Sequence, residues 1–472
     1  MTPLSRSVKA IGSRLDAPLP AMTVVALLTA VTLEVVRSTG PLLEVAFDIS
    51  VITAAATALA TYLGAAVLGL GLVWVTRRAD GPTTLLVGVI VLAVARLALQ
   101  GLTAMPRVAV GLATISLSIA VLTIAVAVLA GRDGGGSASA VAVSVGAAFS
   151  MGTQLALGTW DALWRHSFLG WAPTSLVLVC LIGSAVRARR DPVTLPAWHV
   201  RRMWVMGPAL SLLVMVMANS GFAASQSSVR LAIAGPVATF GLLLAGAVVA
   251  LAGRPGAQRT TLSPRVVTSL IALAPPAAIA GVFWASGPLV LVLLIGSQLA
   301  AFAVVAVTLD RGPTHGFARP APVRDAASAS LVGLGTILPL LVFQLDYDIP
   351  LGFPNELVII ATAVVLGLAT VARSQPRSRA SNSVDGPRTP GSVGRPSRVL
   401  LVGAGLVALV GSGLAIGQEL TTDPQPDVAT DTAPLTLVSW NLHYGVNPDG
   451  GVDLEQIARS IEEENPSIVT LQ

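Results

Sequence analysis

Long apolar runs, separated by short polar segments, occupy most of this chain. A transmembrane helix needs about 20 mostly apolar residues, and thirteen runs have close to that length or more. We predict helices with apolar cores at residues 19–36, 49–75, 83–102, 108–130, 138–157, 168–186, 203–225, 229–252, 266–286, 287–309, 326–343, 356–372 and 399–417. The pattern predicts an all-α polytopic membrane protein with about 13 transmembrane helices.

Basic residues are distributed unevenly between alternate polar segments. With the N-terminus placed inside, the outer loops before the last run hold only four basic residues, Arg37, Arg107, Arg165 and Arg230, although the chain has 29 Lys and Arg. Because cytoplasmic loops are enriched in Lys and Arg, we predict a multi-pass protein of the cell membrane with a cytoplasmic N-terminus. An odd number of crossings then makes the C-terminal part extracytoplasmic.

The largest basic loop before the twelfth run, at residues 187–202, divides the first twelve runs into six and six. Two further segments are poor in apolar residues: one is rich in Ser, Pro, Gly and Arg, which is typical of a disordered linker, and the other is acidic and contains Pro. We therefore predict a first six-helix unit at 1–187, a second at 188–373, a disordered cytoplasmic linker at 374–397, a thirteenth helix at 398–417, an extracytoplasmic linker at 418–433 and a separate C-terminal unit at 434–472.

Composition agrees with the membrane class and excludes some chemistry. The 472 residues are 54% hydrophobic and 11% charged, with a mean hydropathy of +0.78, whereas a soluble domain has about 25% charged residues. Cys180 is the one cysteine. Neither a disulfide within the chain nor a cysteine metal cluster is therefore expected.

The C-terminal unit has a different pattern from the helices before it. Residues 435–445 read LTLVSWNLHYG, and their alternation of β-branched and aromatic residues predicts a strand. Asp453 can cap a helix whose apolar positions follow helical spacing, and Asn465 and Pro466 end that helix. Residues 467–471 then predict a second, buried strand.

The two strands carry sequence that resembles the start of the endonuclease/exonuclease/phosphatase superfamily, the deoxyribonuclease-I-like fold. Trp440-Asn441-Leu442 matches the end of that family's first strand, and SIVTLQ at 467–472 matches its second except at Ser467, where an Asp is usual. The resemblance covers only residues 434–472. It implies the truncated start of an α/β four-layer sandwich domain, in a chain that is part of a longer protein.

By this resemblance, Asn441 is a catalytic and metal-coordinating residue, and Mg²⁺ or Mn²⁺ is the expected cofactor. The main metal-binding Glu of the family would directly follow Gln472, so the chain as given is expected to be inactive as a hydrolase. In the family, a divalent ion stabilises the phosphoryl group during phosphoester hydrolysis. The intact protein would thus be a Mg²⁺-dependent phosphoester hydrolase.

Many helices followed by an outward-facing domain of this kind resemble the membrane proteins that remodel the lipid of glycosylphosphatidylinositol anchors. The resemblance implies a phosphodiesterase or phosphatase acting on a lipid head group, such as that of an inositol lipid, at the membrane surface. Two alternatives stay open: a transporter or flippase whose C-terminal unit is accessory, and a membrane-anchored nuclease. Nucleic acid is the less favoured partner, because ten Asp and Glu accompany only Arg459 after residue 417. The sequence leaves the oligomeric state open.

Ionisable residues near the membrane are further candidates for function. Glu34 and Arg96 have similar predicted depths near the outer ends of their helices; they either form an ion pair or extend separately to the interface. Asp161 and His166, in the outer loop TWDALWRHSFLGW, form a second candidate cluster or are ordinary loop charges.

Overall fold

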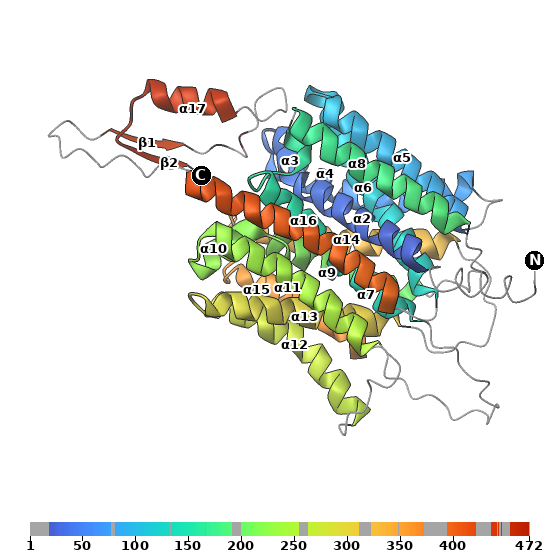
Figure 1. Cartoon of the computed structure of the whole chain (residues 1–472). Coiled ribbons are helices and arrows are strands. Elements are labelled where there is room, and N and C mark those ends of the chain that lie inside the picture. Colours follow the sequence, from blue (N-terminus) through green and yellow to red (C-terminus); the bar gives the residue numbers. More distant parts are fainter. Residues whose placement is uncertain are drawn as a thin grey trace, which may run out of the picture.

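A computed structural model describes residues 18–76, 81–132, 134–165, 167–190, 200–253, 263–310, 322–347, 349–371, 394–421, 436–440, 442, 445 and 454–471. Helices form almost all of this part of the chain (Figure 1). In order they are α2 (Pro18–Arg37), α3 (Thr39–Phe47), α4 (Val51–Val75), α5 (Gly81–Gly101), α6 (Ala104–Ala130), α7 (Gly135–Ala156), η1 (Ala162–Trp164), α8 (Phe168–Arg189), η2 (Val200–Val205), α9 (Met206–Leu212), η3 (Leu213–Met217), α10 (Ser220–Ser227), α11 (Leu231–Ala252), α12 (Pro264–Trp284), α13 (Leu289–Leu309), α14 (Pro322–Leu345), α15 (Glu356–Val371), α16 (Gly394–Thr421) and, in the tail, α17 (Leu454–Glu463).

The helices confirm the polytopic membrane class predicted from the sequence. Eleven helices in the described residues are long and apolar enough to cross a bilayer, and a bent pair makes up to twelve. A shorter apolar helix, α15, has 16 residues, fewer than the roughly 20 that a straight crossing needs. Each of the thirteen predicted runs falls on one of these helical segments. The chain is therefore an all-helical multi-pass membrane protein, with a small α/β tail.

The seventh predicted run is a bent segment rather than one straight helix. Its two parts, Arg202–Met217 and Ser220–Ser227, meet at an angle of 54°. Before the bend, the backbone N–H of Ala218 donates to the carbonyl of Leu213, five residues earlier, which is the wider π spacing. After it, the Asn219 side chain accepts from the N–H of Phe222 at 3.0 Å and caps α10. The apolar pattern continues through both parts, so it did not reveal the break.

Helices in the first and second halves of the body pack in the same order. In the first half, α2 packs on α6, α7 and α8, and α5 packs on α6 and α8. In the second half, α9 packs on α13, α14 and α15, and α12 packs on α13 and α15. The membrane segments of each half can be numbered from one to six in sequence order, with η2 to α10 counted as one segment. In both halves, segment one then packs on segments four, five and six, and segment three packs on segments four and six.

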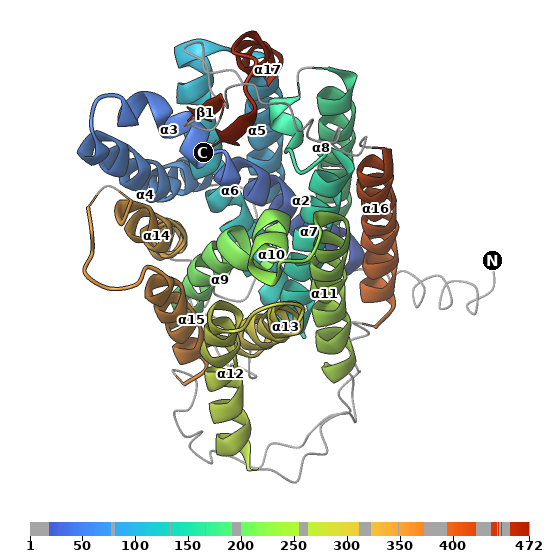
Figure 2. The same cartoon turned by 90° about the vertical axis from the view of Figure 1, so that its left-hand side faces the viewer.

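Contacts between the halves also come in matching pairs. Helix α4, segment two of the first half, packs on α14, segment five of the second half (Figure 2). In the matching contact, α7, segment five of the first half, packs on α11, segment two of the second half. Likewise α7 packs on α13, and α14 packs on α6. Exchanging the two halves therefore reproduces the principal contacts between them.

Glycine permits the closest helix contact between the halves. A Cβ atom on Gly333 of α14 would lie 2.2 Å from the carbonyl oxygen of Tyr62 on α4. Ser330, one turn earlier on α14, donates its hydroxyl to the carbonyl of Leu63 at 3.0 Å. Small residues let membrane helices approach until their backbones touch. This seam therefore depends on the missing side chain at Gly333.

The thirteenth predicted helix, α16, is part of the bundle. It packs along α7 and α11 and also touches α2 (Figure 1). The predicted linker at 374–397 lies outside the described residues except for its last four, which begin α16. The sequence pattern did not predict that this helix contacts both halves.

The tail contains the strand, helix and second strand predicted from the sequence. The prediction that the second strand is buried is wrong for the described residues, because all four of its residues are exposed. Strands β1 (Leu437–Trp440) and β2 (Ile468–Leu471) are parallel, with Leu437 opposite Ile468, and α17 lies between them in the chain. A parallel pair needs such a crossover connection. Asn441 and most of the extracytoplasmic linker lie outside the described residues. The larger sandwich domain stays a prediction.

Candidate functional site

Two ion pairs lie at one end of the first half, the end predicted to be extracytoplasmic. In the first pair, Arg96 of α5 donates to Glu34 of α2 from Nη2 at 2.7 Å and from Nε at 3.1 Å. The Arg96 side chain is fully buried and that of Glu34 is 15% exposed. Arg96 also donates to Gln100 at 2.8 Å and to Thr174 at 3.3 Å. The paired alternative, and not separate extension to the interface, is the arrangement in the structure.

The second pair joins Arg37 of α2 to Asp161 in the loop between α7 and α8. Nη2 and Nε of Arg37 donate to the two carboxylate oxygens of Asp161 at 2.7 and 3.0 Å. Arg37 also donates to Ser150 Oγ at 2.7 Å, and Gln154 donates to Asp161 at 3.3 Å. Because Arg37 follows Glu34 by three residues, both side chains project from one face of α2. One helix face thus holds both ion pairs.

Side chains of α2, α5 and α6 hold the loop that contains η1. Glu34 accepts from the backbone N–H of Leu163 at 3.1 Å, and Arg107 of α6 donates to the Leu163 carbonyl at 3.1 Å. Gln100 donates to the carbonyls of Ala162 and Arg165 at 3.1 and 2.8 Å. Helices α2, α5 and α6 therefore fix the backbone of this loop at the end of the bundle.

Arg107 is a third buried cation at this end. Its side chain is fully buried, and Nε and Nη1 have no hydrogen-bond partner among the described residues. Its guanidinium lies 4.6 Å from the ring centroid of Trp164, a cation–π contact that offsets part of the cost of burial. Among the described residues, Arg107 holds η1 in place by its contact with the Trp164 ring and its hydrogen bond to the Leu163 carbonyl.

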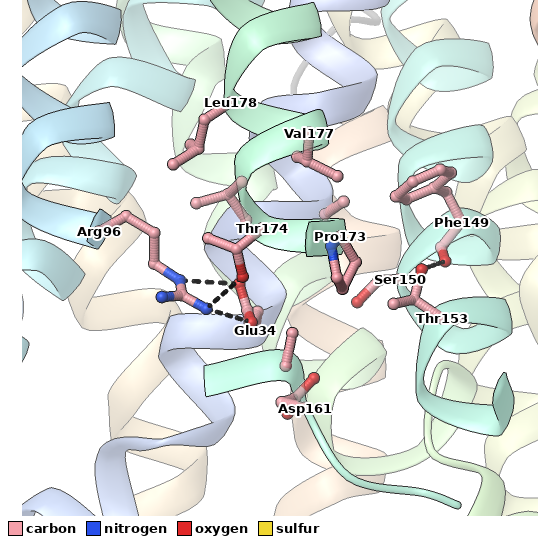
Figure 3. A pocket seen from close by; sticks show the side chains of 13 residues that line it. Glu34, Arg96, Phe149, Ser150, Thr153, Asp161, Pro173, Thr174, Val177 and Leu178 are labelled. Atoms are coloured by element: carbon pink, nitrogen blue, oxygen red, sulfur yellow. Dashed lines mark hydrogen bonds and ion pairs between the residues drawn. The ribbon is translucent and has the colours of Figure 1, made fainter. Parts of the chain in front are cut away.

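A cavity of about 40 Å³ lies between α2, α7, α8 and the η1 loop, with Arg96 of α5 at one side (Figure 3). One water needs roughly 10–15 Å³, so the cavity has room for a few waters or a small polar group. Its polar lining consists of Glu34, Arg96, Ser150, Thr153, Asp161 and Thr174, and its apolar lining of Ala30, Val31, Phe149, Ala162, Pro173, Val177, Leu178. The cavity therefore has a mixed lining, with polar side chains on both sides (Figure 3).

Burial changes the acid chemistry of Asp161. Loss of water around the carboxylate raises the pKa of Asp161, and the positive charge of Arg37 opposes that rise. In the orientation predicted from the loop charges, this carboxylate lies in an outer loop, beside the cavity. Protonation of Asp161 would weaken its two hydrogen bonds with Arg37, since the guanidinium would then face a neutral acid.

Three of the five residues proposed from the sequence meet at this cavity. Glu34, Arg96 and Asp161 line it, whereas His166 and Asn441 lie outside the described residues. Among the residues that the structure describes, no group of three or more His, Cys, Asp or Glu could hold a metal ion. The functional roles of all five residues stay predictions.

Sequence reasoning missed several residues that build the site. Arg37 and Arg107 were counted only as loop charges, and Gln100 was not considered. Two signals were available: Arg37 follows Glu34 by one helical turn, and both arginines belong to the small set of basic residues predicted outside. The Arg230 side chain, from the same set, is 81% exposed, so this signal does not by itself identify a buried pair.

Comparison with known proteins gives no family assignment. The sequence matches no protein-family model and no curated protein. The structure is similar to that of the E. coli fucose:proton symporter FucP (N162A), with 13% identity, a TM-score of 0.49, and coverage of 77% of this chain and 100% of that chain.

Two further solved structures show weaker similarity. The human organic anion transporter MFSD10 (TETRAN) has 13% identity and a TM-score of 0.35 over 84% of this chain and 97% of that chain. A bacterial homologue of the human lysosomal transporter Spinster, inward-facing and occupied, has 14% identity and a TM-score of 0.36 over 85% and 96%. Because every TM-score here is below 0.5, neither fold nor function is inferred from these structures.

Proposed function

We propose that the helical body transports a small polar solute across the membrane. The observation that carries the proposal is the matching of helix contacts when the two halves are exchanged. Secondary transporters are commonly built from such internal repeats, which rock against each other around a site at the interface between them. The cavity lies in the first half, and α7, which forms one of its walls, packs on α11 and α13 of the second half. An anchor for an outward-facing domain needs no repeated body of this kind.

We infer two six-helix units, residues 1–187 and 188–373, with α16 as a thirteenth crossing. The repeated pairing supports this division, with the bent segment and the short helix α15 each counted as one crossing. The excess of basic residues in alternate loops supports a cytoplasmic N-terminus and an extracytoplasmic tail. A reporter fused after Thr421 is expected to be extracytoplasmic; a cytoplasmic reporter would contradict the orientation.

The charges around the cavity favour the binding of a solute without a large net charge. Its two carboxylates, Glu34 and Asp161, are each paired with an arginine, so the pairs are balanced. A net charge added to this desolvated site would cost more free energy than a neutral or dipolar group, which can hydrogen-bond to the hydroxyls of Ser150 and Thr174. We therefore favour neutral or zwitterionic polar solutes over simple ions.

Transport can be tested with purified protein in lipid vesicles. The vesicles would be offered radiolabelled amino acids, sugars, organic acids and a fluorescent phospholipid, each against protein-free vesicles. We expect uptake of at least one neutral or zwitterionic solute, and loss of that uptake in Arg37→Gln. Flux of the phospholipid alone would favour a flippase. Absence of flux for the whole panel, in protein that remains folded, would contradict the proposal.

A hydrolase in the tail is a second proposal, favoured by the order and parallel pairing of β1 and β2 with α17 between them. It rests on the resemblance to the endonuclease/exonuclease/phosphatase superfamily, in which Asn441 would help hold Mg²⁺ or Mn²⁺. The described residues assemble no metal site, so we derive no catalytic step. The expected substrate is the phosphoester of a membrane lipid, such as an inositol lipid.

The hydrolase proposal has its own assay. The longest natural form of the protein would be incubated with phospholipid, nucleotide and DNA, with and without Mg²⁺. Metal-dependent release of a lipid head group that is lost in Asn441→Ala supports it. Cleavage of DNA alone would favour the nuclease alternative, and no cleavage of any substrate would contradict both.

A further inference from the structure

Helix α7 separates the Arg37–Asp161 ion pair from α16. Ser150 and Gln154 of α7 bond to this pair, and Gly152 lies midway between them in the sequence. Successive residues of an α-helix are about 100° apart, so Gly152 projects from the face opposite Ser150 and Gln154. The face of Gly152 is the one that contacts α16.

The contact between α7 and α16 is a backbone contact. A Cβ on Gly411 of α16 would lie 2.2 Å from the carbonyl oxygen of Gly152, and a Cβ on Gly152 would lie 3.2 Å from Cα of Ala408. No side chain separates the two helices at this crossing. Protein interiors are close-packed, so a shift of one backbone here displaces the other.

Helix α16 also contacts the site loop and the second half. At its end, Gln418 Oε1 lies 3.5 Å from the Cβ position of Gly158, in the loop that leads to Asp161. On the other side, Leu401 lies 3.4 Å from the Cβ position of Gly246 on α11.

We propose that α16 couples the cavity at Arg37 and Asp161 to the second half of the body, through its contacts with α7 and α11. A force on α16 moves the turn of α7 that bonds to the ion pair, and a change at the pair moves α16. Such coupling is reciprocal, since it is a free energy shared by two sites. The proposal goes beyond transport and needs no flux to be true.

The coupling can be measured by the accessibility of the cavity. The reporter is Ala162→Cys, which lines the cavity and is 6% exposed, in full-length protein with the native cysteine removed by Cys180→Ser. Vesicles would be treated from outside with a membrane-impermeant maleimide. We expect Gly411→Ala to raise the labelling rate by about fivefold or more, the lower range of typical coupling between sites.

Gly413→Ala is the matched control, because the Cβ position of Gly413 meets none of the described heavy atoms within 4 Å and the helix propensity change is the same. It should leave labelling unchanged. If Gly411→Ala reduces the folded fraction, the same labelling experiment is done with Gly152→Ala. The Cβ of that variant would lie 3.2 Å from Cα of Ala408, so α7 and α16 need to move apart by less. Equal labelling in the seam variants and in Gly413→Ala would overturn the proposal.

Discussion

Arg37 and Asp161 lie 124 residues apart in the chain and form a two-point ion pair, with Nη2–Oδ1 and Nε–Oδ2 distances of 2.7 and 3.0 Å. Both side chains are largely buried, at 12% and 9% exposure. The pair joins the end of the first membrane helix to the loop between the fifth and sixth. It thereby fixes the wall of the cavity from two distant parts of the sequence.

Arg37→Gln should destabilise the protein by about 3 kcal/mol or more, because it leaves the buried Asp161 carboxylate without its partner. Asp161→Asn should cost less, because burial already raises the pKa of this carboxyl and so favours its neutral form in the folded protein. The double variant Arg37→Gln with Asp161→Asn should lose less than the sum of the two, since neither charge is then unpaired. Thermal unfolding in one detergent measures all three. Strict additivity would mean that the two side chains do not interact energetically.

Arg96→Glu should prevent or strongly reduce folding, because two carboxylates would then face each other. Adding Glu34→Arg should recover only part of the loss. The reversed pair restores the attraction, but the Leu163 N–H loses the carboxylate that accepts from it, and Gln100 must turn its amide. The yield of monodisperse protein reports the outcome. No recovery at all would count against the pair as a source of stability.

The pH dependence of stability should contain a contribution from Asp161. Its folded pKa is raised above its unfolded value, near 3.9, so the folded state binds more protons between the two values. Stability from this group is therefore greatest below the unfolded pKa and is lost as pH rises through the folded pKa. Thermal midpoints measured upward from about pH 4 should fall less steeply in Asp161→Asn. The same slope in both proteins would exclude Asp161 as its source.

Gly333→Ala should loosen the contact between the two halves. Its Cβ would be placed 2.2 Å from the Tyr62 carbonyl, so α14 and α4 must separate, at a cost of about 1–3 kcal/mol for overpacking. Gly296→Ala on α13 is the control, because its Cβ position meets no described heavy atom within 4 Å. Thermal unfolding should show a lower midpoint for Gly333→Ala alone. Equal midpoints would mean that the seam tolerates separation.

The membrane helices could be predicted from the sequence because the signal is local. Each run of roughly 20 apolar residues satisfies its backbone within itself and needs no partner to be identified. The bend between Met217 and Ser220 could not be predicted in this way, since residues on both sides are apolar. It is stabilised by Gln298 of α13, whose amide donates to the carbonyls of Met217 and Ala238 at 2.8 and 3.0 Å. Such a contact depends on the tertiary fold.

The site was predictable only in part for the same reason. Similar depth in the membrane suggested that Glu34 and Arg96 could meet, but depth gives no angular position around the bundle. Asp161 was singled out without its partner, because Arg37 reaches it only when the loop folds back onto α2. The tail differs: its strand, helix and strand follow from local alternation and spacing, and all three occur in the structure.

Movement of the two halves against each other is the central claim and can be tested with a disulfide. Ser144 of α7 and Gly246 of α11 lie on opposite halves, with 3.5 Å between their Cβ positions, which suits a disulfide. In a Cys180→Ser background, Ser144→Cys with Gly246→Cys should lock the halves when oxidised. The control is Ser220→Cys with Gly235→Cys, whose Cβ positions lie 3.4 Å apart within the second half.

Solute uptake into vesicles, measured before and after reduction of each disulfide, is the decisive measurement. We predict that oxidation abolishes uptake in the Ser144 and Gly246 variant, that reduction restores it, and that the control pair transports in both states. Equal uptake by the fully cross-linked and the reduced protein would contradict movement between the halves, and with it the proposed transport mechanism.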